Sequence, residues 1–293
     1  MTIFYFTSTG NCLHVAKSLG GRTLSIAKVM QSDNFTFEDD VIGVIFPCYG
    51  FGMPHIVKRF FEKVTFSAGY KFAVISYGNM AAAVTDNVRR HCAKFGISFD
   101  YMNTVLMADN YLPIFDMKEQ IENLPKKDVA GHLNKIRTDI EGKKHFKPSL
   151  TLKKKALTSV LQLGSGFVGG AADKKFIITS DCNGCKICER VCPVQNIEVS
   201  DKVEYKHRCL GCLGCIHACP QNAIHLKSQK SAVRFRNENV SRAEIIEASG
   251  NDRSAHRSAV SCRAKEENPV RIVKKALDED TENQLEKATD HEN

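Results

Sequence analysis

Residues 182–193 read CNGCKICERVCP, and residues 209–220 read CLGCLGCIHACP. Each cysteine of the first stretch has a counterpart 27 residues later (182 to 209), and Ile197 and Ile224 keep the same offset. The two stretches therefore form an internal repeat, which implies two equivalent structural units. The remaining cysteines are scattered over the chain: Cys12, Cys48, Cys92 and Cys262.

The spacing within each stretch suits a cubane 4Fe–4S cluster. Three cysteines separated by two residues can hold three corners of one cluster, and the fourth, followed by proline, reaches the neighbouring cluster. We therefore assign the cysteines to two clusters in a crossed pattern. The first cluster takes Cys182, Cys185, Cys188 and Cys219. The second cluster takes Cys209, Cys212, Cys215 and Cys192.

Zinc is the alternative, because it also binds four cysteines. Zinc sites usually pair two Cys-x-x-Cys knuckles and need neither a third cysteine nor a Cys-Pro in each repeat. The pattern therefore favours iron and sulfide. The neighbouring histidines, His207, His217 and His225, are expected to be surface or packing residues rather than ligands.

Composition and charge limit the cellular setting. The chain has 293 residues, of which 43% are hydrophobic, and a formal net charge of +8. No basic segment precedes an apolar stretch at the start, and the longest nearly apolar stretch, 156–172, is too short and too polar to span a bilayer. We expect a cytoplasmic protein without a transmembrane segment, in which many cysteines indicate metal binding rather than disulfides.

Residues 1–141 alternate between strand and helix patterns. Apolar runs predict strands at 3–6, 41–46, 72–75 and 99–107. Between and after them, helical patterns cover 13–19, 56–64, 80–95 and 117–140. Such alternation predicts a mostly parallel sheet covered by helices on both faces.

The loop after the first predicted strand has the features of a phosphate site. Its residues are Thr7, Ser8, Thr9, Gly10, Asn11 and Cys12. Hydroxyl groups and backbone N–H groups at a helix N-terminus can bind a phosphate, and glycine lets the backbone approach closely. The loop is neither a Walker A motif nor a dinucleotide fingerprint. It resembles the FMN-phosphate loop of flavodoxins, with Cys12 at a position where threonine is usual.

Two further loops strengthen this resemblance, and both follow predicted strands. Pro47, Tyr49, Gly50 and Phe51 match the flavodoxin loop that flanks the isoalloxazine ring. Ser76, Tyr77, Gly78 and Asn79 match the loop on the other side of the flavin. Ligands of doubly wound folds bind at the carboxyl ends of the strands, so the resemblance implies an FMN site there. The alternative is a flavodoxin-like domain that folds but binds no flavin.

The chain as a whole resembles proteins that fuse a flavodoxin-like domain to a bacterial-type two-cluster ferredoxin. This implies an α/β flavodoxin-like doubly wound parallel sheet followed by a small α+β ferredoxin-like domain. We place the flavodoxin-like domain at 1–145, a basic and then glycine-rich linker at 146–175, and the two-cluster domain at 176–228. Residues 229–293 form a C-terminal extension, expected to carry a short helix near 242–248 and to be disordered after 250.

The expected function is electron transfer between two 4Fe–4S clusters and an FMN, because the flavin exchanges two electrons in single steps and each cluster exchanges one. No side chain stands out as a catalytic acid or base. Two alternatives remain: an iron–sulfur flavoenzyme that reduces a small molecule, and a ferredoxin whose flavin-free domain only docks partners. We expect redox proteins as partners, and no nucleic acid. The lysine-rich linker could dock a partner with an acidic surface; the favoured alternative is a solvated linker without a docking role.

Overall fold

The structure, a computed structural model, describes residues 1–148, 172–251 and 267–290. Its N-terminal module is built on five parallel strands. Their order across the sheet is β2 (Arg22–Ser25), β1 (Thr2–Tyr5), β4 (Val41–Pro47), β6 (Tyr70–Tyr77) and β7 (Tyr101–Leu106). Counted along the chain, this is the 2-1-3-4-5 order of flavodoxin-like folds. Two short strands, β3 (Thr36–Glu38) and β5 (Thr65–Ser67), pair only with each other.

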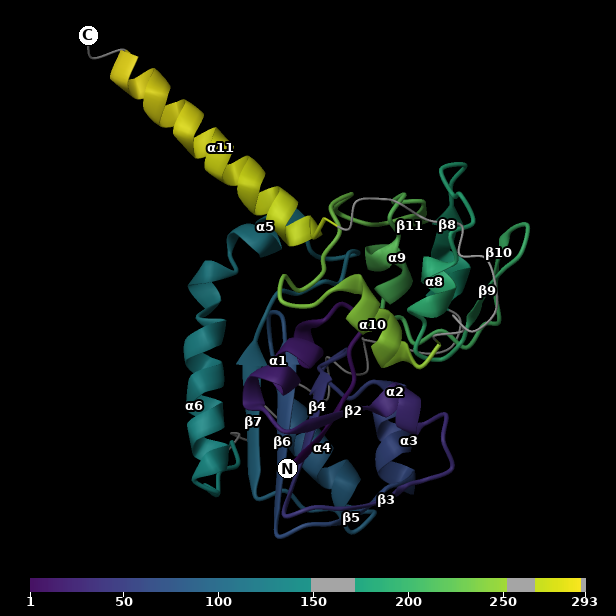
Figure 1. Cartoon of the computed structure of the whole chain (residues 1–293), viewed down its shortest axis with the longest axis vertical. Helices are drawn as coiled ribbons and strands as arrows, with labels where there is room; N and C mark the ends of the chain where they lie inside the picture. The colour runs from purple at the N-terminus through teal and green to yellow at the C-terminus, as the bar shows by residue number, and fades with distance from the viewer. Residues whose placement is uncertain (149–171, 252–266, 291–293) are drawn as a thin grey trace.

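Helices cover both faces of the sheet, because successive side chains of a strand point to opposite faces. Ile3 and Tyr5 pack in one apolar cluster, whereas Phe4 and Phe6 pack in the other. The first cluster includes α1 (Asn11–Leu19), α5 (Met117–Glu122) and α6 (Val129–Glu141), and the second includes α2 (Ile26–Val29), α3 (His55–Lys63) and α4 (Val84–Ala93). The predicted flavodoxin-like α/β fold is thus confirmed (Figure 1).

The strand order reverses between β1 and β4, which lie side by side in the middle of the sheet. The loops that leave the carboxyl ends of these two strands turn to opposite sides and leave a crevice between them. Residues 6–10 follow β1, and residues 48–54 follow β4. The topology therefore brings two of the predicted cofactor loops to the same crevice.

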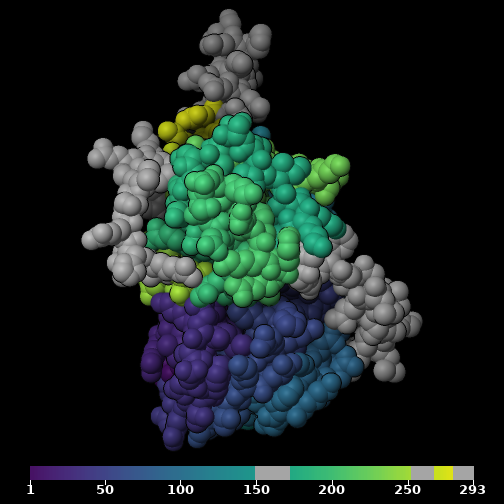
Figure 2. Space-filling model, turned by 90° about the vertical axis from the view of Figure 1, so that its right-hand side faces the viewer, coloured from purple at the N-terminus to yellow at the C-terminus, as the bar shows by residue number. Residues whose placement is uncertain are grey.

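The cysteine module follows as a small α+β unit. Its elements are η2 (Ala172–Lys175), β8 (Phe176–Ile178), α8 (Ile187–Arg190), β9 (Ile197–Val199), β10 (Val203–Tyr205), α9 (Gly214–Ala218) and β11 (Ile224–Leu226). Strands β9 and β10 form one antiparallel pair, and β8 and β11 form the other. Each sequence repeat thus supplies one short helix and a following strand. Figure 2 shows the module stacked on the N-terminal module, with a seam between them.

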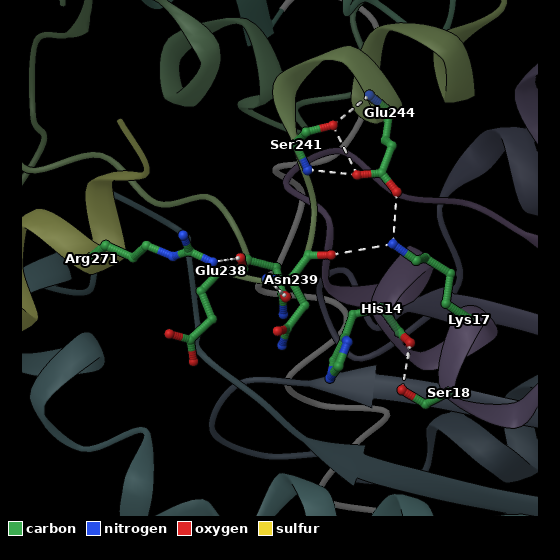
Figure 3. A network of polar contacts seen from close by, with 9 residues as sticks. His14, Lys17, Ser18, Glu238, Asn239, Ser241, Glu244 and Arg271 are labelled. Carbon is green, nitrogen blue, oxygen red and sulfur yellow. Dashed lines mark hydrogen bonds and ion pairs between the residues drawn. The ribbon is translucent and has the colours of Figure 1, made fainter. Parts of the chain in front are cut away.

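Residues 231–251, here called the strap, run from the cysteine module back across the N-terminal module. The backbone N–H of Asn237 donates to the Thr9 carbonyl (2.9 Å), and its side-chain amide donates to Asn11 Oδ1 (3.1 Å). Lys17 Nζ contacts Glu244 Oε1 (2.7 Å) and the Asn239 carbonyl (3.3 Å), as Figure 3 shows. The strap therefore binds the first loop and the first helix of the sheet module.

The helix of the strap, α10 (Arg242–Ser249), touches both modules. It starts with a capping box, in which Ser241 and Glu244 satisfy each other's backbone N–H groups. At its end, the Ala248 carbonyl accepts from Ser25 Oγ, and the Ser249 carbonyl accepts from Gln31 Nε2 (2.9 Å). Asn251 Nδ2 then donates to the Cys192 carbonyl in the cysteine module. The strap consequently holds the two modules together.

The expectation of disorder after residue 250 is wrong for Pro269–Asp290, which form helix α11. Asn268 Oδ1 accepts from the backbone N–H of Val270 (2.9 Å), and Pro269 occupies the first turn, where its missing N–H costs nothing. Val270 is fully buried, and Lys274 pairs with Glu238 of the strap (2.8 Å). These contacts fix the start of α11 to the strap. Residues 252–266, and residues 149–171 of the predicted linker, lie outside the described residues.

Other differences from the predicted elements are local. Strand β2 has no counterpart among the predicted strands, because its sequence RTLS is short and polar and lies at the edge of the sheet. The range 117–140, which was expected to contain a long polar helix, holds α5 and α6, separated by the 3₁₀ turn η1 (Pro125–Lys127). Proline cannot continue the preceding helix, since it lacks the N–H donor. Nowhere in the described ranges does a helix reach the length and apolarity that a membrane crossing requires.

Gly43 provides a test of the sheet packing. It lies opposite Phe72 on β6, and a β-carbon there would lie 2.1 Å from Cζ of that fully buried ring. We expect Gly43→Ala to destabilise the N-terminal module by about 1–3 kcal/mol, because the ring cannot move aside. Urea unfolding followed by circular dichroism measures this, with Gly69→Ala as the matched control, since its nearest neighbour would be 3.7 Å away. Equal midpoints for both variants would contradict this packing.

Candidate functional site

A cavity of about 370 Å³, here called the edge cavity, opens at the carboxyl edge of the sheet. Its walls are the loops that follow β1, β4, β6 and β7, and Gly211, Cys212 and Leu213 of the cysteine module lie over it. The structure places thirteen of the predicted cofactor residues in its lining. They are Thr7, Ser8, Thr9, Asn11, Cys12, Pro47, Tyr49, Gly50, Phe51, Ser76, Tyr77, Gly78 and Asn79.

Gly10 is the one predicted cofactor residue outside this lining. It has a positive φ of 98° and faces the strap, where an added β-carbon would lie 2.9 Å from Val240 Cβ. Glycine is thus needed here for both its backbone conformation and its lack of a side chain. Its role is to let the strap approach, which the sequence pattern did not reveal.

The loop after β1 is ordered by its own hydrogen bonds. The Gly10 N–H donates to Thr7 Oγ1 (3.1 Å), and Asn110 Nδ2 donates to Thr9 Oγ1 (2.5 Å). Cys12 Sγ contacts Ser76 Oγ (3.1 Å), and burial raises the pKa of this thiol to about 12. The neutral thiol therefore links two loops, while the N-terminus of α1 presents its partial positive charge beside the cavity.

In the loop after β7, the sequence singled out only Tyr111, either as a residue that covers a flavin or as an ordinary packed residue, and Tyr111 lines this cavity. Met107, Ala108 and Asp109 also line the cavity. Lys127 anchors this loop, since its ammonium donates to the Met107 carbonyl (2.7 Å) and to the Gly78 carbonyl (3.1 Å). Burial raises the pKa of the Asp109 carboxyl and lowers that of Lys127. Besides Tyr111, the position of this loop at the end of a predicted strand was the signal for it in the sequence.

The eight repeat cysteines line two separate cavities. Cys182, Cys185, Cys188 and Cys219 line the first, here called the outer cavity. Cys192, Cys209, Cys212 and Cys215 line the second, here called the inner cavity. Each set combines three cysteines of one repeat with the Cys-Pro cysteine of the other.

The surroundings of these sulfurs suit bound thiolates. Backbone N–H groups donate to Cys192 Sγ from Asn196 (3.2 Å) and to Cys219 Sγ from Ala223 (3.3 Å). Burial, together with the neighbouring cysteines of the same set, raises the pKa of Cys188 to about 12. Burial disfavours the thiolate of Cys188, and metal coordination would offset this cost.

The edge cavity and the inner cavity share a wall, because Cys212 and Leu213 line both of them. Tyr49 lies at the same place, and its hydroxyl contacts Ser8 Oγ (3.2 Å). Burial raises the pKa of this hydroxyl, and the nearby Cys212 raises it further. A β-carbon on Gly214 would lie 3.2 Å from the Ser8 carbonyl. The backbones of the two modules are thus in close contact at the loop after β1.

His217 connects three segments at this joint and is fully enclosed. Its Nδ1 accepts from the backbone N–H of Phe235 (3.1 Å), so Nε2 carries the proton and donates to the Asn110 carbonyl (2.8 Å). Burial lowers its pKa to about 4. His217 is therefore a neutral packing residue, within the range of roles expected for it, and it ties the cysteine module to the strap and to the loop after β7.

Comparison with known proteins identifies the cysteine module. Residues 181–224 match the family model described as a 4Fe-4S dicluster domain. A stretch of 57 residues is 37% identical to a subunit of the ion-translocating oxidoreductase complex of Methanosarcina acetivorans; it covers 19% of this chain and 22% of that protein. The match thus spans about a fifth of the relative's length. This chain therefore contains a 4Fe–4S domain, and electron transfer is the chemistry of such domains.

Solved structures show weaker likenesses. A putative flavoprotein from Bacteroides uniformis aligns with a TM-score of 0.30 at 16% identity, over 37% of this chain and 91% of that one. The rubredoxin oxygen:oxidoreductase of Desulfovibrio gigas aligns with a TM-score of 0.28 at 15% identity, over 46% of this chain and 36% of that one. The fold assignment rests on the strand order instead.

His217→Ala tests the joint between the modules. It would leave the Asn110 carbonyl and the Phe235 N–H without their buried partner, so we expect a loss of about 2–4 kcal/mol in unfolding free energy. Chemical denaturation of the cluster-loaded protein measures this loss. His132→Ala is the control, because His132 is exposed on α6. If both variants unfold at the same denaturant concentration, His217 does not hold the joint.

Proposed function

We propose that this protein carries electrons between two 4Fe–4S clusters and an FMN, in the spatial order outer cluster, inner cluster, FMN. The observation that carries the proposal is the shared wall, where Cys212 lines both the inner cavity and the edge cavity. A cysteine that ligates the inner cluster would then also border the flavin. The outer cavity shares no lining residue with the edge cavity, so its cluster would be the more remote one.

The cluster ligands are the two crossed sets of four cysteines. Their placement around separate cavities and the N–H groups that face their sulfurs support the assignment. In the described part of the chain, no three His, Cys, Asp or Glu side chains are close enough together to hold one metal ion. A cluster that spreads its ligands over four irons fits this spacing better than zinc does.

The edge cavity would hold the FMN. Thr7, Ser8 and Thr9, with the first amides of α1, would bind the phosphate, while Tyr49, Phe51 and Tyr77 would flank the ring. When bound, the flavin supplies the exchange between single electrons and electron pairs. The chain's own residues orient it and limit its contact with water, with Gly211–Leu213 lying over the cavity.

The domain roles follow from these sites. Residues 1–145 would form the flavin module, 146–175 the linker and 176–228 the two-cluster module. Within the extension 229–293, the strap would fix the distance between the inner cluster and the flavin, because it binds both modules. We therefore expect electrons to pass between the cofactors without any movement of the modules.

Cofactor analysis tests the proposal most directly. Protein purified without oxygen should contain about eight iron, about eight sulfide and one FMN per chain. After rapid mixing with a strong reductant, the flavin absorbance should change only after the broad cluster absorbance begins to fall. Stoichiometric zinc would refute the iron–sulfur clusters. FAD in place of FMN would refute the choice of flavin, and protein without any flavin would refute the flavin site.

Cysteine variants test the crossed ligands. Serine is a harder ligand and would alter one iron only. Cys192→Ser and Cys209→Ser should change the same EPR component, because both cysteines line the inner cavity. Cys182→Ser and Cys219→Ser should change the other component. Should Cys192→Ser instead group with Cys182→Ser, each repeat would hold its own cluster.

Thr9→Ala tests the phosphate position. This substitution removes the Thr9 hydroxyl, which also accepts a hydrogen bond from Asn110. The loops after β1 and β7 thereby lose the hydrogen bond that joins them. We expect FMN to bind roughly tenfold more weakly, as the loss of one hydrogen bond predicts. Fluorescence titration of the flavin-depleted protein measures the affinity, and Thr138→Ala on the exposed face of α6 is the matched control. If Thr9→Ala binds FMN with unchanged affinity, the phosphate does not bind at this loop.

A further inference from the structure

A second large cavity lies along the seam between the modules, and here it is called the basic groove. It measures about 650 Å³ and opens to solvent. Helices α2 and α3 form one side of the groove. Two short segments of the cysteine module, residues 193–195 and 207–210, form the other side. The predicted cofactors do not account for it, although one predicted cluster ligand, Cys209, is part of its lining.

Two arginines and a lysine, Arg59, Lys63 and Arg208, make the rim of the groove cationic, and two histidines lie beside them. His55, Arg59 and Lys63 are spaced by four residues, so they share one face of α3, and His207 and Arg208 lie opposite. All five side chains are exposed. No aspartate or glutamate lines the groove among the described residues.

Within the described residues, an acidic group contacts the rim histidine His207, but none contacts the arginines or the lysine of the rim. Asp173 is buried beneath His207, to whose Nδ1 it lies at 3.1 Å. Glu62 of α3 contacts His91 of α4, away from the groove (4.0 Å). Arg208 donates to the Gln195 carbonyl (3.0 Å), and the Lys63 ammonium lies over the Phe35 ring (4.8 Å). Within the described ranges, no carboxylate is paired with Arg59, Lys63 or Arg208.

The floor of the groove combines apolar side chains with a cluster ligand. Met30, Ile56, Val194 and Leu210 contribute the apolar part. Cys209, which also lines the inner cavity, is partly exposed here. An apolar centre with a charged rim is the pattern of a protein docking surface. The groove therefore offers a contact surface beside the inner cluster.

We propose that the basic groove docks a one-electron carrier protein with an acidic face, which exchanges electrons with the inner cluster at Cys209. This inference rests on the proposed function, since it needs the inner cluster. In each encounter one electron leaves the reduced centre and arrives at the oxidised one, and no bond or proton is transferred. The inner cluster thereby becomes a junction between the partner, the outer cluster and the flavin.

A protein fits the groove better than a small anion does. The cationic side chains are all exposed, so a small anion would remain hydrated and weakly held. A protein surface would instead cover the apolar floor and meet the separated cations with separated carboxylates. Transient electron-transfer complexes use small interfaces of this kind.

The test uses the full chain with its clusters and a probe protein, plastocyanin, which is an acidic blue-copper carrier. The reduced chain is mixed with oxidised plastocyanin, and the loss of blue colour reports the transfer rate. Arg59→Glu with Arg208→Glu should slow this rate about tenfold or more at low salt, and the difference should shrink at about 0.5 M salt. Lys135→Glu with Arg137→Glu on α6 is the matched control, since both residues are exposed and the change in net charge is identical.

The outcomes separate this inference from the proposed function. Iron, sulfide and flavin contents are measured first, and a wild-type chain without clusters would overturn the proposed function itself. With clusters present, equal slowing by both double variants would show that only the net charge matters. That outcome would overturn the docking site. The groove would instead be assigned to small anions if two results came together. Inorganic pyrophosphate would bind tightly to the wild type but not to Arg59→Glu with Arg208→Glu, and this double variant would leave the plastocyanin rate unchanged.

Discussion

The contact between Gly214 and the Ser8 carbonyl is the constraint on which the rest of the structure depends. Any side chain at Gly214 would press on the Ser8 backbone, at 3.2 Å from its carbonyl oxygen. This approach lets Cys212 and Leu213 form a wall common to the edge cavity and the inner cavity. Without this approach, Cys212 and Leu213 could not cover the edge cavity, although the strap would still join the two modules.

Polar interactions that are enclosed at the joint maintain this contact. The neutral His217 imidazole binds a loop of one module and the backbone of the strap, and the strap binds the loop after β1 through Asn237. Buried donors and acceptors that lose a partner cost far more than exposed ones. The joint is therefore specific, because a shifted arrangement of the modules would leave several such groups unpaired.

Much of this could be predicted from the sequence, because local patterns encode it. The apolar strands, the loops at their ends and the two cysteine repeats each depend on neighbouring residues. Gly211 and Leu213 were missed as site residues, since only the folded chain brings them to the edge cavity, and so was Lys127, which anchors one of its loops. Gly10 was assigned to the cofactor, whereas its glycine character serves contact with the strap. The helix α11 was missed because its packing against the strap is a tertiary effect.

The strap comes after both modules in the chain, and this order has a consequence for biosynthesis. During synthesis the sheet module leaves the ribosome first, the cysteine module second, and the strap that joins them after both. Each module thus has an interval in which it is folded but not yet joined to the other. Until the cysteine module packs against the sheet, Gly211, Cys212 and Leu213 do not cover the edge cavity. The order of the chain would thus leave the cavity open to an entering cofactor early in synthesis.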